Sequence, residues 1–139
     1  MIIEKVREYF LKCPLIDVKR QINVDYLGVD AVEYTIDSVP VEPTLNKYVD
    51  GGALKQFVFV FGSREYYGAD VLQNMDNSGF YQLFYEWLDK QNNIGNLPLL
   101  EGGKIAKEIK AITQGYMFDS GEESARYQIQ CRLTYYEDK

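Results

Sequence analysis

A chain of 139 residues with 46% hydrophobic and 26% charged residues can bury one hydrophobic core, and this composition is typical of globular rather than disordered proteins. Its formal net charge of −6 disfavours sequence-reading on duplex DNA, because an acidic surface repels phosphates. The chain has no histidine, which excludes Ser-His-Asp and Cys-His catalysis, HExxH zinc sites and a histidine general base.

No apolar run approaches the length of a membrane span, and the N-terminal segment MIIEKVREYF carries charges where a signal peptide is apolar. We therefore expect an intracellular protein that does not enter a membrane. The cysteines, Cys13 and Cys131, lie far apart and lack a metal-ligand spacing. They are expected to be small buried thiols rather than a disulfide.

The first third of the chain predicts a helix followed by strands. Apolar residues recur at helical spacing over residues 2–13, and Pro14 ends the pattern. Residues 22–38 alternate between apolar and polar, as strands do, with a break at Gly28. Pro40 and Pro43 then interrupt any ladder, so the segment between them is expected at an edge or a crossing point.

Residues 44–62 predict a β-hairpin, because Asp50-Gly51-Gly52 can supply a turn with positive φ between two β-prone runs. Its second arm, residues 54–61, loses alternation at FVFVF, which indicates a central strand covered on both faces. The segment SREYY that follows is expected to leave the sheet and touch a neighbouring protein.

The region from residue 68 to residue 93 is predicted to be helical. Asp70 is expected to cap a short turn and Ser78 a longer helix, which runs to about Asn92 and stops near Gly95. Large apolar and aromatic side chains of the longer helix fill an arc of roughly 200°: Phe80, Tyr81, Leu83, Phe84, Tyr85, Trp87 and Leu88. One sheet needs about half of that arc, so the surplus is covered either by the N-terminal helix or by a neighbouring subunit.

A final hairpin is predicted from a strand over residues 109–118, a turn at Asp119-Ser120-Gly121, and a strand over residues 125–136. The last segment alternates regularly. One side is expected in the core, namely Ala125, Tyr127, Ile129, Cys131, Leu133 and Tyr135. The other side is more polar, namely Arg126, Gln128, Gln130, Arg132, Thr134 and Tyr136.

The order of these elements predicts the fold class. Strands and helices do not alternate as in βαβ units, which favours an α+β arrangement. We expect residues 1–139 to form one domain, with a mainly antiparallel sheet of four to five strands and helices packed on one face.

Motifs for cofactors and metals are missing from the sequence. The glycine-bearing segments DGG, EGGK and FGSREYYG lack the spacing of phosphate-binding loops. The acidic segment DSGEE lacks the EF-hand pattern, and a solvated hairpin tip explains it better. We therefore expect no catalytic residue, no cofactor, no metal ligand and no enzymatic activity.

Tyrosine is in excess, with 12 residues, and several tyrosines stand beside arginine. Tyrosine and arginine anchor protein interfaces, although tyrosine is also a common strand residue. The candidate interface residues are Arg64, Tyr66, Tyr67, Arg126 and Arg132.

Several segments, in this order, resemble a family of small minor capsid proteins of tailed phages and prophages: YVDGG, FVFGSREYYGADVLQNMDNSGFY, WL, GNLP, GYMFD and ARYQIQCRLTYY. The resemblance extends from about Tyr34 to Tyr136. That family is similar to tail-terminator and head–tail joining proteins, whose α+β subunits close into rings, commonly hexamers.

The resemblance implies a structural virion protein without catalytic residues, made in the bacterial host cytoplasm. Its implied partners are copies of itself in a ring and other phage head or tail proteins, and it can stay monomeric until these are present. DNA would pass such a ring without sequence-specific contacts. The alternative, from the residues alone, is a small-molecule-binding or enzymatic α+β domain with acidic and tyrosine groups in a cleft between helix and sheet.

Overall fold

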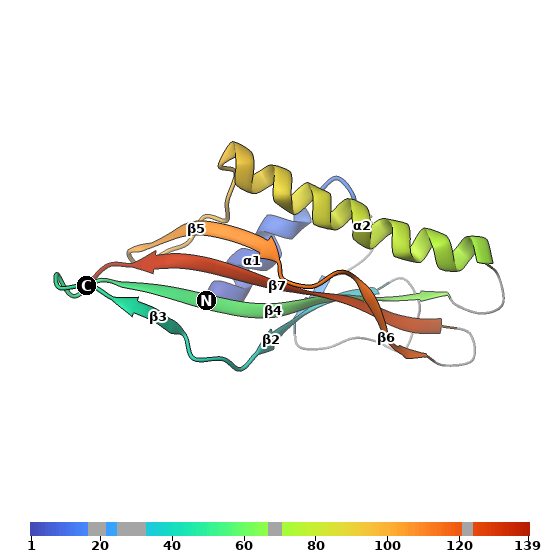
Figure 1. Ribbon diagram of the computed structural model, residues 1–139, viewed down its shortest axis with the longest axis horizontal. Helices are drawn as coiled ribbons and strands as arrows, with labels where there is room; N and C mark the ends of the chain where they lie inside the picture. Colours follow the sequence, from blue (N-terminus) through green and yellow to red (C-terminus); the bar gives the residue numbers. More distant parts are fainter. Residues whose placement is uncertain (17–21, 25–32, 67–70, 121–123) are drawn as a thin grey trace.

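The computed structural model describes residues 1–16, 22–24, 33–66, 71–120 and 124–139 (Figure 1). The helices are α1 (Ile2–Leu11) and α2 (Val71–Ile94). The strands are β1 (Ile22–Val24), β2 (Glu33–Val39), β3 (Thr44–Lys47), β4 (Ala53–Tyr66), β5 (Lys104–Ala111), β6 (Tyr116–Ser120) and β7 (Ser124–Glu137). The predicted α+β class and the mostly antiparallel sheet are confirmed, but the described strands form a seven-stranded sheet where four to five strands were expected.

The sheet has the order β1-β2-β4-β7-β5, and β1 runs parallel to β2. Strands β2 and β3 follow one another along the same edge of β4, while β5 and β6 share the other edge of β7. Pro40 and Pro43 lie in the segment between β2 and β3. Because proline donates no ladder hydrogen bond, the chain leaves β4 there and returns to it further along, as the prolines predicted.

Strand β4 is central, and it is longer than the sequence predicted. The turn before it has Gly51 at φ 93°, and the Gly52 amide donates to Asp50 Oδ1 at 2.9 Å. The apolar run is buried on both faces, as expected. However, β4 continues through Tyr66, and Ser63 is only 1% exposed. The expectation that SREYY leaves the sheet is therefore wrong for Ser63 to Tyr66, because β7 pairs with β4 along its whole length.

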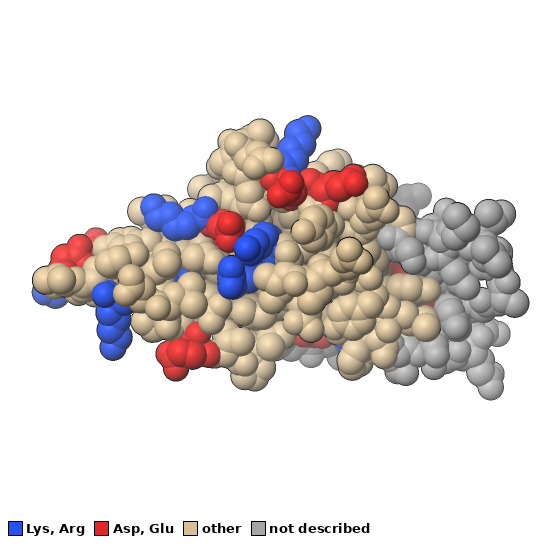
Figure 2. All heavy atoms as spheres, viewed as in Figure 1, with Lys and Arg blue, Asp and Glu red and all other residues tan. Residues whose placement is uncertain are grey.

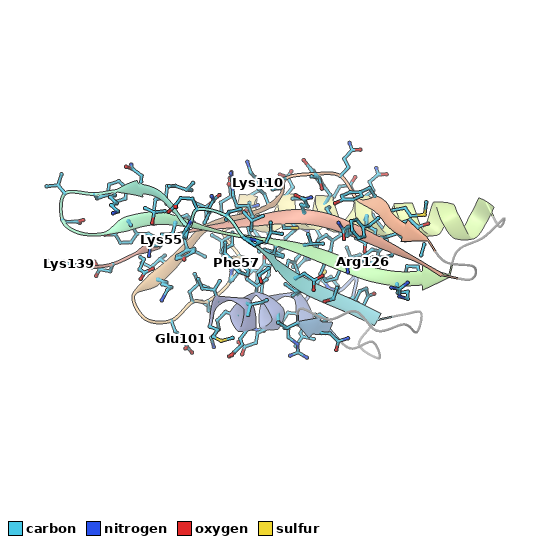
Figure 3. All side chains as sticks on the ribbon, turned by 90° about the horizontal axis from the view of Figure 1, so that it is seen from below. Lys55, Phe57, Glu101, Lys110, Arg126 and Lys139 are labelled. Carbon is cyan, nitrogen blue, oxygen red and sulfur yellow. The ribbon has the colours of Figure 1, made fainter. Side chains whose placement is uncertain are left out.

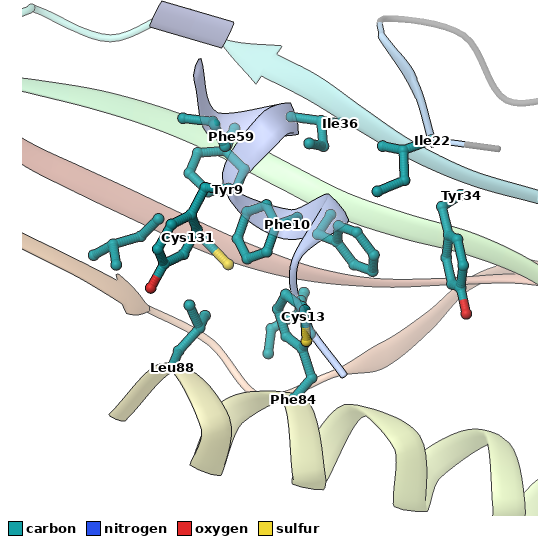
Figure 4. Packing of buried hydrophobic residues seen from close by; sticks show 14 of the residues in the cluster. Tyr9, Phe10, Cys13, Ile22, Tyr34, Ile36, Phe59, Phe84, Leu88 and Cys131 are labelled. Carbon is teal, nitrogen blue, oxygen red and sulfur yellow. The ribbon is translucent and has the colours of Figure 1, made fainter. Parts of the chain in front are cut away.

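Both helices contribute side chains to one aromatic core (Figure 4). The ring of Phe10 in α1 lies 5.8 Å from Phe59 and 5.6 Å from Phe61 in β4, and 5.3 Å from Phe84 in α2. The alternation predicted for β7 is confirmed, since its expected core residues are all buried. Cys131 belongs to this set, and it is a free thiol like the buried Cys13, as predicted.

Helix α2 corrects the expected boundary at Ser78. The helix runs without interruption from Val71 to Ile94, so Ser78 lies inside it and is not at its start. Serine is only moderately unfavourable in a helix interior, so its presence does not require a helix to start there. Asp70 lies outside the described residues. The predicted stop is confirmed, because Gly95 has φ 75° and its amide donates to Asn92 O.

Residues 104–120 form two strands instead of the predicted single strand at 109–118. β5 begins at Lys104, and its ladder with β7 overrides the helix-forming composition of its first half. The chain then leaves the ladder before β6. Gly115 lies in this break, where a Cβ would be 2.3 Å from Tyr81 Cβ, so α2 packs against bare backbone.

Candidate interaction face

Among the described residues, the aromatic side chains of the helices contact Phe59 and Phe61 of β4, and we call the opposite face of the sheet the open face. Figure 3 looks onto it with α2 behind the sheet. The register places alternate residues of five strands on it: Thr35, Asp37, Val58, Val60, Gly62, Arg64, Lys110, Tyr116, Arg126, Gln128, Gln130 and Arg132. Val58 and Val60 are buried on this face.

Arg126 is bound on several sides within the open face. Its Nη2 lies 2.6 Å from Asp37 Oδ2, and its Nε donates to Gln128 Oε1 at 3.0 Å. Thr35 Oγ1 donates to the other oxygen of Asp37 at 2.8 Å. The guanidinium also lies 5.5 Å from the centre of the Phe118 ring. This arginine is therefore held by contacts within its own subunit.

A chain of polar contacts continues from Arg126 towards β6. The amide nitrogen of Gln128 donates to the Tyr116 hydroxyl at 2.7 Å, and that of Gln130 donates to the same oxygen at 3.2 Å. Gln128 is buried, so its amide needs these partners. The network rigidifies one end of the open face.

Arg132 lies on the same face of β7 but in a different environment. Its Nε is buried without a hydrogen-bond partner. In the register, Arg132 stands directly opposite Lys110 of β5. Like charges in directly opposed positions destabilise a sheet. Lys110 has only a long ion pair with Glu108, at 3.9 Å, and no described carboxylate forms an ion pair with Arg132.

The predicted interface residues are partly brought together. Arg64, Arg126 and Arg132 share the open face, and Arg64 is directly opposite Arg126 in the register. Tyr66 ends β4 opposite Ser124. Tyr67 lies outside the described residues. The sequence analysis missed Asp37, Lys110 and Tyr116, and nothing in the sequence signalled them, because their contacts join strands that are distant along the chain.

A second uncovered region is the hairpin arm, which we define as residues 41–57. It forms the end of the sheet beyond α1 and α2, at the left of Figure 1. Its exposed apolar side chains are Val41, Leu45, Tyr48 and Val49. The Tyr48 ring lies 6.0 Å from that of Tyr136, which fixes the base of the turn and leaves the tip to solvent.

The apolar surplus of α2 is covered in part by α1. The Trp87 ring lies 5.5 Å from the Tyr9 ring and 6.2 Å from the Phe10 ring. Of the two predicted ways to cover the surplus, the N-terminal helix therefore accounts for part. Leu83 nevertheless remains 53% exposed and Tyr85 43% exposed on the outer surface of α2. Part of the stripe is therefore free to face another protein.

A groove of about 590 Å³ runs between α2 and the segment before β6, and Tyr85, Glu86 and Gln114 help to line it. At its base, the buried Tyr81 hydroxyl lies 2.6 Å from Ser63 Oγ and donates to Tyr127 O at 2.9 Å. Burial raises the pKa of Tyr81 far above its ordinary value of 10.0, so this phenol stays protonated even at a pH where an exposed tyrosine ionises. Both of its neighbours are internal, so it ties α2 to the sheet.

The acidic and sulfur-containing side chains of the described residues form no group suited to a metal ion. Neither described helix is long and apolar enough to cross a membrane. Burial raises the pKa of the Cys131 thiol, which keeps it protonated and unreactive.

Comparison of the chain with protein-family models and with curated proteins finds no match. The function is therefore argued from the residues and their geometry.

Proposed function

We propose that this protein is a structural subunit of a tailed phage or prophage virion, which assembles with copies of itself into a ring at the tail end or the head–tail junction. It acts by protein–protein assembly and has no substrate. In this role the fold is that of a tail-terminator-like subunit, with both helices on one side of its sheet.

The hairpin arm is the observation that carries the proposal. Its exposed residues at the turn, Tyr48 at the base and Val49 at the tip, are large apolar side chains on a hairpin that projects beyond the helix-covered core. Exposed apolar groups on a projecting element favour a protein partner. A projection at one end of a subunit makes head-to-tail contacts, which close into a ring when the rotation allows.

Further support comes from the sequence. The segments that resemble phage minor capsid proteins include the tip of the arm (YVDGG) and the polar strand (ARYQIQCRLTYY). The net charge of −6 also suits a ring through which DNA slides, because like charge prevents tight contacts with phosphates.

The test is the mass of the assembled protein. The full chain and its Tyr48→Ser/Val49→Asp variant are compared by light scattering and negative-stain electron microscopy over a range of concentrations, with and without a tail-tube protein from the same genome. We expect closed rings of the unmodified chain and monomers of the variant.

The matched control is Leu99→Ser, which removes another highly exposed apolar side chain away from the arm. It is expected to assemble like the unmodified chain. A chain that stays monomeric under every one of these conditions would contradict the proposed function.

The groove beside α2 favours a second candidate, the binding of a small molecule. A cleft of about 590 Å³ is large enough for such a ligand. Screening a fragment library by NMR distinguishes the two functions. Saturable shifts confined to residues around Tyr85 and Gln114 would favour the ligand, while their absence together with ring formation would favour the structural role.

A further inference from the structure

We infer that Lys110 and Arg132 form a docking point for two carboxylates of a second copy of this chain, Glu86 and Asp89 on the outer surface of α2. The inference rests on the proposed function, and it names the two surfaces that meet between neighbouring subunits.

The basic half of the contact is unsatisfied within the subunit. Lys110 and Arg132 are directly opposed across β5 and β7, where their charges repel. The Arg132 Nε is buried without an acceptor, a cost that folded proteins rarely leave uncompensated. The buried Nε is out of reach of a partner, but the guanidinium is planar and an incoming carboxylate can bind its two terminal nitrogens through two hydrogen bonds.

The acidic half lies on α2. Glu86 and Asp89 are both exposed, and neither forms an ion pair with the side chains that the structure describes. They flank the same outer surface as the exposed Tyr85. Lys90 is an exposed cation beside them, so the stretch carries two negative charges against one positive charge. Over α2, Figure 2 shows Asp and Glu atoms together with Lys or Arg atoms, and over the sheet below it Lys and Arg atoms with Asp or Glu atoms among them.

The spacing of the two cations matches the spacing of the two carboxylates. Directly opposed residues on neighbouring strands have Cβ atoms about 4.5–5.5 Å apart. Residues three positions apart on a helix, such as Glu86 and Asp89, have Cβ atoms about 5–6 Å apart. A helix laid across the open face can therefore present one carboxylate to each cation.

A protein partner fits this face better than nucleic acid. The net charge of −6 disfavours a phosphate chain, which needs many basic contacts, whereas two carboxylates need only the two cations. A second copy is favoured because it brings both the carboxylates and the apolar contact of Leu83 and Tyr85. Since the two halves lie on different elements, each subunit binds one neighbour by each half, which is the arrangement that a ring needs.

The experiment uses two full-length variants that each lose one half: Lys110→Gln/Arg132→Gln, and Glu86→Gln/Asp89→Asn. Sedimentation velocity of each alone is expected to show the association constant reduced about tenfold or more and the ring lost. An equimolar mixture is expected to give dimers that grow no further, because one intact basic half meets one intact acidic half. The matched control, Lys12→Gln/Lys107→Gln, removes two exposed lysines outside both halves and should leave the rings intact.

The outcomes separate this inference from the proposed function. If both variants form rings like the unmodified chain while the Tyr48→Ser/Val49→Asp variant does not, the contact is wrong and the ring proposal stands. If Lys110→Gln/Arg132→Gln changes only retention on duplex DNA, the pair is a phosphate site and the inference is overturned. If the unmodified chain forms no ring under any condition, both proposals fail.

Discussion

Strand β7 meets different surroundings on its two faces. On the helix-covered face, its side chains pack into the aromatic core, and even the polar Tyr81 hydroxyl beside them has two internal partners. On the open face, Arg126 is fully engaged by Asp37 and Gln128, whereas Arg132 has a buried Nε without an acceptor. The covered face and Arg126 stabilise the subunit, whereas we propose that Arg132 binds a partner. Four substitutions test this division, from the largest expected effect to the smallest.

Phe61→Ala should cause the largest loss of stability. Phe61 is fully buried, with the Phe84 ring 4.7 Å away and the Phe10 ring 5.6 Å away. Removing it leaves a cavity, so we expect the free energy of unfolding to fall by about 3–5 kcal/mol in urea denaturation. Val60→Ala, on the adjacent and opposite-facing position, is the control and should cost clearly less. Equal losses would contradict the division between the faces.

Tyr81→Phe should cost about 1–3 kcal/mol, because it leaves Ser63 Oγ and Tyr127 O without their buried partner. It should also change the pH dependence. Burial raises the pKa of Tyr81 above its ordinary value of 10.0, so this group's contribution is complete below that pH and is lost as the pH rises above it.

Urea denaturation at about pH 8 and about pH 10.5 measures this effect. The unmodified chain should lose more stability between the two than Tyr81→Phe does. The decline should persist in part in the variant, because burial also raises the pKa of Tyr9. An identical decline in both proteins would show that Tyr81 ionises as easily in the folded state as in the unfolded chain.

Arg126→Met should lower the free energy of unfolding by about 1–2 kcal/mol, a value reduced from that of a buried pair because the side chains of Arg126 and Asp37 are 18% and 26% exposed. A double-mutant cycle with Asp37→Asn isolates their interaction. We expect the double variant to lose less than the sum of the single variants, and strict additivity would show that the ion pair contributes nothing.

Arg132→Met should have the smallest effect on the monomer, within about 0.5 kcal/mol of the unmodified chain or slightly stabilising, because it removes the repulsion with Lys110 and an unsatisfied donor. The measurement is the same urea denaturation at a concentration where the protein is monomeric. A loss of unfolding free energy as large as that of Arg126→Met would show that Arg132 stabilises the subunit. It would then contradict the difference proposed between the two arginines.

Local patterns predicted those parts of the fold that depend on neighbouring residues in sequence. The period of two over residues 125–136 identified both faces of β7, and Asp50-Gly51-Gly52 identified the hairpin turn. The sequence analysis was wrong where the structure of a segment depends on a contact with residues distant in sequence. Residues 104–108 are helix formers that become strand by pairing with β7, and Ser63 is buried because Tyr81 reaches it from α2.

On the open face too, local patterns predicted where residues lie but not the contacts that they make. The alternation placed Arg126 and Arg132 on the polar side of β7, and the register adds Arg64 beside them. Their different roles could not be predicted, because Arg126 differs from Arg132 through Asp37, 89 residues away along the chain. A contact of that separation depends on the strand order and leaves no local pattern.

The unbroken pairing of β4 with β7 also has a mechanical consequence. The two strands are paired without a bulge from Ala53 opposite Glu137 to Tyr66 opposite Ser124, over 14 residues, which is about 45 Å of ladder. A pull on the tip of the arm along the strand direction would load all of these rungs in shear at once instead of peeling them one after another. Strands β4 and β7 would thus resist stretching together and transmit tension from the tip of the arm to the far end of the subunit.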